Sequence, residues 1–323
     1  MRALVTGGAG FVGGVVVQAL LDRGDEVTVI DNLRSTSADD VPKGAELHEL
    51  SVGDEEGIAA VLRSARYDAC FHLAGRIESG ISMEQPEEFF ATNVAETLCL
   101  LRALVAAGVE RFVFSSSAAV YGDPDYTPID EGHPTRAVSP YGETKLLVER
   151  SLAWLASLGK LHYASLRYFN AAGAVPGRAE RHRPETHLIP IALAVAAGER
   201  DALDLYGDDY PTPDGTCVRD YVHVADLASA HLLAVEAIGA RAELVCNLGT
   251  GTGSSNAEVI TAVREVTGRA ITVRHAPRRP GDAAILVAAN DLARAELGWA
   301  PVRSALQEVV GDAWAAMTAS ALG

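Results

Sequence analysis

Cysteine and lysine are both scarce in this chain of 323 residues. The four cysteines lie far apart and form no Cys-x-x-Cys pair, which argues against a zinc site and against a disulfide-stapled secreted domain. We therefore expect a cytoplasmic protein that holds no metal. Only Lys43, Lys145 and Lys160 are lysines, so arginine carries most of the positive charge.

Positive charge as a whole is in deficit, with 27 Lys and Arg against 43 Asp and Glu and a net charge of −16. Such a chain repels a phosphate backbone or an anionic membrane surface, so we expect neither nucleic acid nor membrane as a partner. An anionic small molecule would need a local positive site. The content of 48% hydrophobic and 22% charged residues is ordinary for a globular protein and excludes a disordered or fibrous chain.

The first residues form an uncharged run from Ala3 to Leu21, which could be taken for a signal peptide or a membrane span. Five glycines interrupt the run between Gly7 and Gly14. A short strand, a glycine turn and a helix explain this pattern better. We expect no membrane span there.

Strands and helices are expected to alternate over the first half of the chain. Apolar runs predict strands, and the spacing of apolar residues predicts helices. The expected strands are 3–6, 26–30, 68–73, 111–115 and 163–168, and the expected helices 15–21, 86–107 and 140–158. This alternation predicts an α/β fold with a doubly wound parallel sheet of the Rossmann type over residues 1–170.

The pattern changes after residue 170, where long polar loops rich in Pro, Gly and His separate short helical runs at 189–197, 224–238 and 256–266. We interpret 171–323 as mainly a smaller carboxy-terminal substrate-binding lobe, with some segments that return to the Rossmann domain. Long ordered loops usually carry function.

The glycines Gly7, Gly10 and Gly13 directly follow the first expected strand and open a helix. Glycine allows a tight turn and lets the backbone approach a pyrophosphate at the helix amino terminus. A plain strand-to-helix turn would show the same glycines. Asp31 ends the second expected strand, where a carboxylate accepts hydrogen bonds from the adenosine ribose and repels a 2′-phosphate, so NAD is favoured over NADP.

Tyr141 and Lys145 stand four residues apart, on one face of an expected helix. The serines 115–117 close the preceding strand at its carboxyl end, the edge where open parallel sheets bind ligands. A nearby ammonium and a positively charged nicotinamide would lower the pKa of the tyrosine, which could then take a proton from a substrate hydroxyl. The alternative is a solvated lysine beside a surface tyrosine.

Several longer segments join these residues: 6–13 (TGGAGFVG), 115–122 (SSSAAVYG), 139–142 (SPYG), 166–170 (LRYFN) and, most specific of all, 207–224 (GDDYPTPDGTCVRDYVHV). With them, nearly the whole chain resembles the extended short-chain dehydrogenase/reductase family and, within it, the UDP-glucose 4-epimerases. The resemblance implies an isomerase, with a nucleotide-sugar substrate and a homodimer.

The resemblance also implies roles for individual residues. Tyr141 would be the acid/base, Lys145 would orient the nicotinamide ribose, and Ser117 would bind the reacting hydroxyl. Family NAD contacts fall on Gly7, Gly10, Phe11, Val12, Gly13, Asp31, Asn32, Asp54, Leu73, Ala74, Gly75, Asn93, Ser115, Tyr141, Lys145 and Phe169. Nucleotide-sugar contacts fall on Ser117, Tyr141, Asn170, His187, Leu188, Tyr206, Arg219, Arg279 and Asp282.

The reaction implied by the resemblance takes the proton of the sugar 4-OH at Tyr141 and passes the C4 hydride to NAD. The 4-keto sugar then turns over, and the hydride returns to its opposite face. Because NAD is regenerated in every cycle, we expect it to stay bound as a prosthetic group.

Three positions depart from the best-known members. His187 stands where an asparagine usually contacts the diphosphate. Leu286 falls on the position that governs acceptance of a 2-acetamido group, which is tyrosine in narrow pockets and smaller in broad ones. Ile77, with Arg76 beside it, replaces a lysine near the nicotinamide diphosphate. These departures leave the exact sugar open.

Other functions remain in competition with UDP-glucose/UDP-galactose interconversion. An epimerase of another nucleotide sugar (UDP-GlcNAc/GalNAc, UDP-glucuronate or a specialised sugar) is one. A dehydratase, reductase or decarboxylase on the same fold is another, although Ala118 and Ala119 stand where dehydratases have an Asp-Glu pair. A non-catalytic NAD sensor is the third. His182, His187, Glu180 and Glu185 could suggest a metal, but a solvated loop explains them better.

Overall fold

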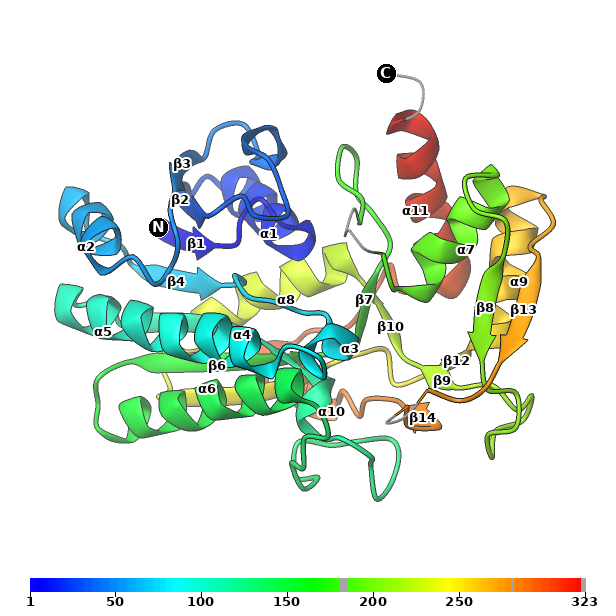
Figure 1. Ribbon diagram of the computed structural model, residues 1–323. Helices are drawn as coiled ribbons and strands as arrows, with labels where there is room; N and C mark the ends of the chain where they lie inside the picture. The colour runs from blue at the N-terminus through cyan, green and yellow to red at the C-terminus, as the bar shows by residue number, and fades with distance from the viewer. Residues whose placement is uncertain (181–184, 280–281, 321–323) are drawn as a thin grey trace.

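A parallel sheet of seven strands forms the centre of the molecule, which is described by a computed structural model over residues 1–180, 185–279 and 282–320 (Figure 1). The strand order is β11-β6-β5-β4-β1-β2-β3, and every neighbouring pair is parallel. The strands are β1 (Arg2–Thr6), β2 (Glu26–Asp31), β3 (Glu46–Glu49), β4 (Ala69–His72), β5 (Arg111–Ser117), β6 (His162–Tyr168) and β11 (Glu243–Leu248). The predicted doubly wound sheet is confirmed.

Helices cover both faces of this sheet. One apolar core packs beneath α1 (Phe11–Asp22), α8 (Val224–Ala237) and α10 (Asp291–Leu297). A second core packs beneath α2 (Glu55–Ser64), α5 (Thr97–Ala107) and α6 (Pro140–Ser157), of which α5 and α6 run side by side in Figure 1. Both cores consist mainly of branched aliphatic side chains, because strands buried on two faces need apolar residues on both.

The carboxy-terminal lobe has its own core, between α7 (Leu188–Ala197), α9 (Asn256–Thr267) and α11 (Leu306–Ser320). Three small sheets complete it. They pair β8 (Leu203–Tyr206) with β13 (Val273–Ala276), β7 (Asn170–Ala172) with β10 (Tyr221–His223), and β9 (Val218–Arg219) with both β12 (Ser254–Ser255) and β14 (Ile285–Leu286). Because α8 and β11 come from this half of the chain, it also contributes to the Rossmann sheet.

The helix expected over 86–107 is divided into three parts. It consists of α4 (Pro86–Phe89), a π-helical segment over Phe90–Glu96, and α5. Such wide turns are frequently found at functional sites. Here the π segment carries Asn93, whose buried side chain accepts from the Arg76 amide (2.8 Å) and donates to the Arg76 carbonyl (2.9 Å).

By length and composition, the run Pro86–Ala107 could also cross a membrane, since its mean hydropathy is 1.4. A helix buried in a protein core can be as long and as apolar. Leu100, Leu101 and Leu104 of this run are buried in the core between α5 and the sheet. Packing against the sheet therefore accounts for the buried part of this run, which is 33% of the apolar window.

A buried ion pair links α6 to the sheet. The guanidinium of Arg167 on β6 donates to both carboxylate oxygens of Glu149, at 3.0 and 2.6 Å. The Ser116 hydroxyl on β5 donates to the same carboxylate at 2.6 Å, and Arg167 also donates to the Tyr121 hydroxyl at 2.8 Å. The side chains of Arg167 and Glu149 are 8% and 6% exposed, so each charge depends on its partner.

We expect Arg167→Met to destabilise the protein by about 3–5 kcal/mol, because it leaves a buried carboxylate without its counter-charge. The double variant Arg167→Met, Glu149→Gln should recover much of this loss, since no buried charge then remains. Urea unfolding monitored by circular dichroism measures both. A double variant as unstable as the single one would contradict the assigned cause.

Candidate active site

The sheet changes winding direction between β1 and β4, where the chain leaves towards opposite edges. In open α/β sheets, ligands bind beyond the carboxyl ends of the strands at such a point. The glycine turn follows β1, and Leu73, Ala74 and Gly75 follow β4, so both segments lie at this place. The Leu73 amide donates to the Thr6 carbonyl at 3.0 Å, which keeps the two segments together.

The glycine turn fits so closely against its neighbours that side chains would not be accommodated. Gly7 has φ +72°, and a Cβ there would lie 2.6 Å from the Ala74 nitrogen. A Cβ on Gly13 would lie 2.0 Å from the Gly7 carbonyl oxygen. Gly10 caps α1 without a side-chain hydrogen bond, and the first turn, with Phe11 and Val12, contains no acidic residue. The amino terminus of α1 is thus suited to an external anion.

Asp31 lies at the carboxyl end of β2, beside this turn. Its carboxylate accepts hydrogen bonds from the amides of Ala9 (3.1 Å) and Leu33 (2.9 Å). Asn32 follows and accepts from the Arg34 amide at 3.2 Å. The carboxylate is thereby fixed where the sequence predicted a partner for the adenosine ribose.

Helix α6 brings Tyr141 and Lys145 to the carboxyl end of β5. Ser139 caps the helix by accepting from the Gly142 amide at 3.2 Å, and Pro140 occupies its first turn. A Cβ on Gly142 would lie 2.4 Å from the Ala119 carbonyl oxygen, so glycine lets the helix approach the segment after β5.

The Lys145 ammonium is almost completely buried among the predicted catalytic residues. It donates to the Ser115 carbonyl at 2.8 Å and lies 5.8 Å from the centroid of the Tyr141 ring. Burial lowers the pKa of Lys145 to about 8, while Glu149 one turn further along α6 acts in the opposite direction. Gly75 is close by, since a Cβ there would lie 3.9 Å from the Lys145 nitrogen.

Ser117 lies next to Tyr141, as the predicted proton transfer requires. Burial raises the pKa of Tyr141, the Ser117 hydroxyl lowers it, and the carboxylate of Glu78 raises it. The sequence led us to expect that Lys145 would lower this pKa. Lys145 is not among the groups that shift this pKa, and burial outweighs the effect of Ser117. Ionisation of the phenol therefore requires further positive charge nearby.

Other predicted cofactor residues are placed differently. Asn93 braces the segment after β4 and donates to the Thr144 hydroxyl at 3.1 Å. Phe169 is buried next to the end of β6. Asp54 is exposed and caps α2 by accepting from the Gly57 amide at 3.0 Å, so it has a structural role whether or not it contacts an adenine.

The predicted sugar-nucleotide residues of the carboxy-terminal lobe gather around β8, β9 and β14. The guanidinium of Arg219 donates to the Ala283 carbonyl at 2.8 Å and lies 3.5 Å from the Asp282 carboxylate. Arg279 stacks on the Tyr206 ring, with 3.8 Å between the guanidinium carbon and the ring centroid. Two cations and an aromatic face thus come together, as recognition of a nucleoside diphosphate requires.

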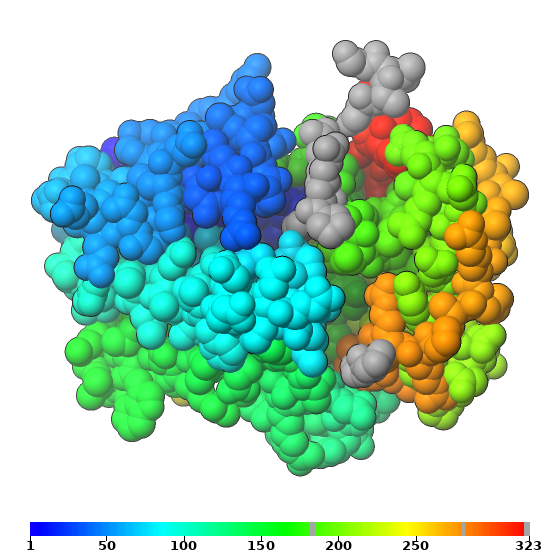
Figure 2. All heavy atoms as spheres, viewed as in Figure 1, coloured from blue at the N-terminus to red at the C-terminus, as the bar shows by residue number. Residues whose placement is uncertain are grey.

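Leu286 pairs in register with Arg219 across β14 and β9. It also packs against the cluster that contains Ala118 and Phe169, next to the end of β5 at Ser117. This contact brings the lobe to the predicted reaction centre. In Figure 2 a hollow lies between the cyan surface of α3 (Ser79–Ser82) and the orange segment near β14.

The remaining predicted sugar contacts lie at the start of β7 and at the start of α7. Asn170 begins β7, and its amide donates to the Asp220 carbonyl at 2.8 Å. His187 stands at the start of α7, ahead of Leu188, and its Nδ1 lies 2.7 Å from the Glu185 carboxylate. Within the described residues no group of three or more His, Cys, Asp or Glu could hold a metal; His182 lies outside them.

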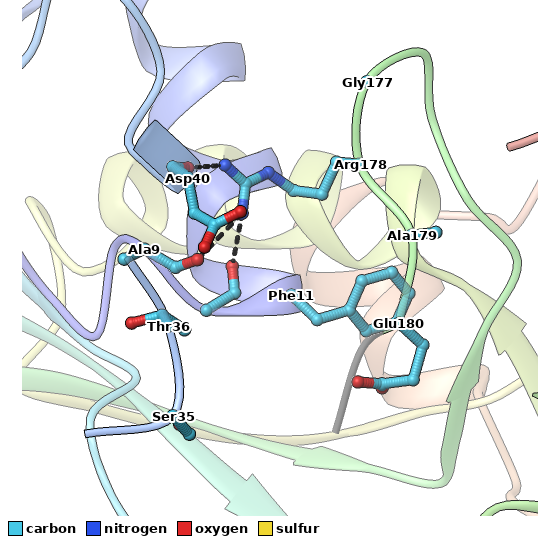
Figure 3. Close-up of a pocket in the computed structure, with 10 residues that line it drawn as sticks. Ala9, Phe11, Ser35, Thr36, Asp40, Gly177, Arg178, Ala179 and Glu180 are labelled. Atoms are coloured by element: carbon cyan, nitrogen blue, oxygen red, sulfur yellow. Dashed lines mark hydrogen bonds between the residues drawn. The ribbon is translucent and has the colours of Figure 1, made fainter. Parts of the chain in front are cut away.

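Arg178 was not singled out from the sequence. It follows β7 in the chain, yet it reaches the glycine turn and hydrogen-bonds the carbonyls of Ala9 and Gly10, each at 2.9 Å (Figure 3). No local sequence pattern predicts a contact between residues so far apart in the chain. Glu149 and Arg167 were missed as well, although Glu149, four residues after Lys145 on the same helix face, gave a usable signal.

Comparison with known proteins agrees with this geometry. The sequence model of the NAD dependent epimerase/dehydratase family matches residues 3–249. A UDP-glucose 4-epimerase of Streptomyces lividans is 48% identical over 314 residues, 97% of this chain and 95% of that protein. One of Corynebacterium glutamicum is 46% identical over 323 residues, 100% and 97% of the two chains.

A solved structure is similarly close. The UDP-glucose-4-epimerase from Stenotrophomonas maltophila, crystallised with NAD and formylated UDP-arabinopyranose, is 39% identical with a TM-score of 0.96. The match covers 100% of this chain and 99% of that one. By its sequence over most of its length and by its fold, the chain belongs to the NAD dependent epimerase/dehydratase family.

Proposed function

We propose that this protein is a UDP-sugar 4-epimerase that interconverts UDP-glucose and UDP-galactose and keeps NAD bound throughout. The observation that carries the proposal is the convergence of Ser117, Tyr141 and Lys145 at the carboxyl end of β5, beside Gly75. Full-length similarity to UDP-glucose 4-epimerases supports the same activity. We assign residues 1–170 to the NAD-binding domain and 171–323 mainly to the substrate lobe.

The glycine turn and its surroundings fit a dinucleotide. Glycines 7 and 13 let the turn pack tightly against Ala74 and against itself, so that the uncapped start of α1 can face a pyrophosphate, and Asp31 is placed to accept from the adenosine ribose hydroxyls. When bound, NAD supplies a hydride acceptor and donor for C4 of the sugar. We propose that the other residues predicted to contact the cofactor do so as well.

Tyr141 acts as the base for the sugar 4-OH and returns the proton when the ring is reduced again. Ser117 donates its hydroxyl hydrogen to the reacting sugar oxygen beside Tyr141. Lys145 orients the nicotinamide ribose, and its buried ammonium brings positive charge within 5.8 Å of the Tyr141 ring centroid. Arg219 and Arg279 neutralise the diphosphate, while Tyr206, one face of which carries Arg279, has its other face for the uracil.

The first experiment supplies the purified protein with UDP-galactose and no added cofactor. UDP-glucose should form and be detectable with a coupled dehydrogenase. UDP-N-acetylgalactosamine is assayed in parallel, because Leu286 beside Arg219 is smaller than the tyrosine of narrow-pocket members. Formation of a 4-keto-6-deoxy sugar, or no turnover across a UDP-sugar panel, would overturn the proposal.

Tyr141→Phe removes the phenolic proton acceptor and should lower kcat by at least about 100-fold. The variant should still retain NAD, which is measured from the nucleotide released on acid denaturation. Tyr126→Phe is the matched control, because Tyr126 is exposed and its hydroxyl contacts only Asp130 among the hydrogen bonds of the described residues. Near-normal turnover of Tyr141→Phe would exclude its assigned role.

Lys145→Met should stabilise the fold while it abolishes most activity. The native pKa of about 8 lies below that of the unfolded chain, so a buried ammonium destabilises the native state at pH 7. Urea unfolding of dinucleotide-free protein should show a gain of about 1–3 kcal/mol at pH 7.

The sign of this effect also predicts its pH dependence. Between the native pKa of about 8 and the unfolded value of about 10.4, the unfolded chain binds more protons, so the wild type gains stability as pH rises. The advantage of Lys145→Met should therefore shrink by pH 10. Lys43→Met, at an exposed lysine, should show no such trend. A constant advantage across this range would contradict the assignment.

We also propose that the protein is a cytoplasmic homodimer. Trp154, Leu158 and Leu98 are exposed large apolar side chains, at 71%, 64% and 43%. They line one groove between α5 and α6, with Leu101, Val105 and Leu155. A patch of this kind is typical of a subunit interface. All four cysteines are free thiols, which suits a reducing compartment.

Trp154→Glu should convert the dimer to a monomer, because it places a charge in the centre of the apolar patch. Sedimentation velocity measures the change directly. Val302→Asp, at a position 81% exposed outside this groove, should leave the oligomeric state unchanged. A wild type that sediments as a monomer would refute the dimer without bearing on the reaction.

A further inference from the structure

A tight turn presents Arg178 to the dinucleotide-binding half of the molecule. The amide of Val175 donates to the Arg178 carbonyl at 3.0 Å, and the amide of Arg178 donates back at 2.9 Å. Pro176 and Gly177, with φ +77° at Gly177, occupy the corner, a sequence that favours a type II turn. This turn follows β7, which belongs to the substrate lobe. Arg178 therefore reaches the glycine turn from the other half of the chain.

The guanidinium of Arg178 joins three segments. Its Nη1 donates to the carbonyls of Ala9 and Gly10 in the glycine turn, both at 2.9 Å, and its Nη2 donates to the Asp40 carbonyl. Asp40 ends the segment that follows Asp31 and contains Ser35 and Thr36. Figure 3 shows the side chain reaching across to Asp40 and Ala9, above Phe11. These segments surround the place predicted for the adenosine half of the dinucleotide.

Gly14 is the residue of α1 against which this guanidinium packs. It lies inside α1, where glycine is about 1 kcal/mol less favourable than alanine. A Cβ at Gly14 would lie 2.0 Å from Cζ, 2.3 Å from Nη1 and 2.4 Å from Nε of Arg178. The helix therefore leaves out a side chain where the guanidinium packs.

The charge of Arg178 is placed against the positive end of α1, whose first turn contains no acidic residue. Such an arrangement favours a bound anion close by. Arg76, the cation adjacent to the missing lysine position at Ile77, is engaged elsewhere: it lies 3.1 Å from the Glu88 carboxylate and 5.0 Å from the Phe89 ring centroid. In a chain of net charge −16, Arg178 is thus well placed to help retain a pyrophosphate.

We propose that Arg178 is a positioning residue that fastens the 173–180 segment over the adenosine side of the dinucleotide site and slows the release of NAD. It orders the glycine turn and the segment to Asp40 by bridging their carbonyls, and it has no part in proton or hydride transfer. This inference rests on the proposed function, in which NAD is a resident cofactor.

The test measures exchange of bound NAD for a fluorescent etheno-NAD, together with the NAD that remains after gel filtration. Arg178→Ala should accelerate exchange by about ten-fold or more, as expected for the loss of two or more hydrogen bonds. Gly14→Ala should do the same, because its methyl group displaces the intact Arg178 side chain. Arg178→Lys should exchange at an intermediate rate, since one ammonium cannot reproduce the bridging fork.

Two controls separate this effect from general damage. Arg241→Ala removes an arginine whose partner is Glu296, at the opposite end of the sheet before β11. Gly311→Ala fills open space on α11. Both should exchange NAD like the wild type. Saturating NAD added to Arg178→Ala should restore kcat, which a catalytic role for Arg178 would prevent.

Exchange within about two-fold of the wild type in either Arg178→Ala or Gly14→Ala would overturn the inference. So would a kcat that saturating NAD fails to restore in a variant whose thermal unfolding is unchanged. A wild type that carries no NAD and shows no epimerase turnover would instead refute the proposed function. If Arg178→Ala does not fold, Gly14→Ala and Arg178→Lys carry the same test.

Discussion

Lys145 keeps an ammonium group almost out of water, and much of the site is arranged around that charge. Its near neighbours are the Ser115 carbonyl and the faces of Phe114 and Tyr141, which stabilise a cation only in part. Glu149 would be its natural partner one turn along α6, but that carboxylate is hydrogen-bonded to Arg167 and Ser116. The ammonium is therefore under-compensated, as its lowered pKa of about 8 shows.

An under-compensated cation stabilises any anion that forms beside it. A phenolate on Tyr141 would be such an anion, and ribose hydroxyls would provide further hydrogen-bond acceptors. Under the proposed function, the stability that the fold loses by burying Lys145 would favour the ionisation of Tyr141 once the site is filled. Glu149 is paired with Arg167, so its carboxylate compensates the Lys145 charge only in part.

The sequence allowed the fold class and the proximity of Tyr141 to Lys145 to be predicted, because both depend on short-range patterns. Glycine spacing at 7, 10 and 13 and the four-residue spacing of Tyr141 and Lys145 are local features of a turn and a helix. β3 was missed because it is a polar edge strand whose residues are exposed or half-buried, so it lacks the apolar signal of the inner strands. The apolar spacing of Ile58, Val61 and Leu62 would have revealed α2.

Long-range contacts were out of reach for a different reason. The contact of Arg178 with Ala9 joins residues 169 positions apart, and the register of Leu286 with Arg219 depends on how three short strands meet. A pattern of neighbouring residues does not predict such long-range contacts until the topology of the fold is known. Gly14 illustrates this. In the sequence it is one of five glycines in the same turn, whereas in the structure the Arg178 guanidinium occupies the space that a side chain at Gly14 would need.

The two halves of the molecule are consequently less independent than a division near residue 170 suggests. The carboxy-terminal half supplies α8 and β11 to the Rossmann sheet, and Ile129 is held between the Val287 carbonyl and the Ala289 amide by hydrogen bonds of 2.8 and 2.7 Å. The 173–180 segment adds a third connection at the glycine turn. Under the proposed function, an enzyme that holds a redox cofactor through both half-reactions gains from such connections, because the segments around the dinucleotide site are anchored in the lobe assigned to the substrate. Retention of the cofactor and binding of the substrate would then depend on one continuous structure.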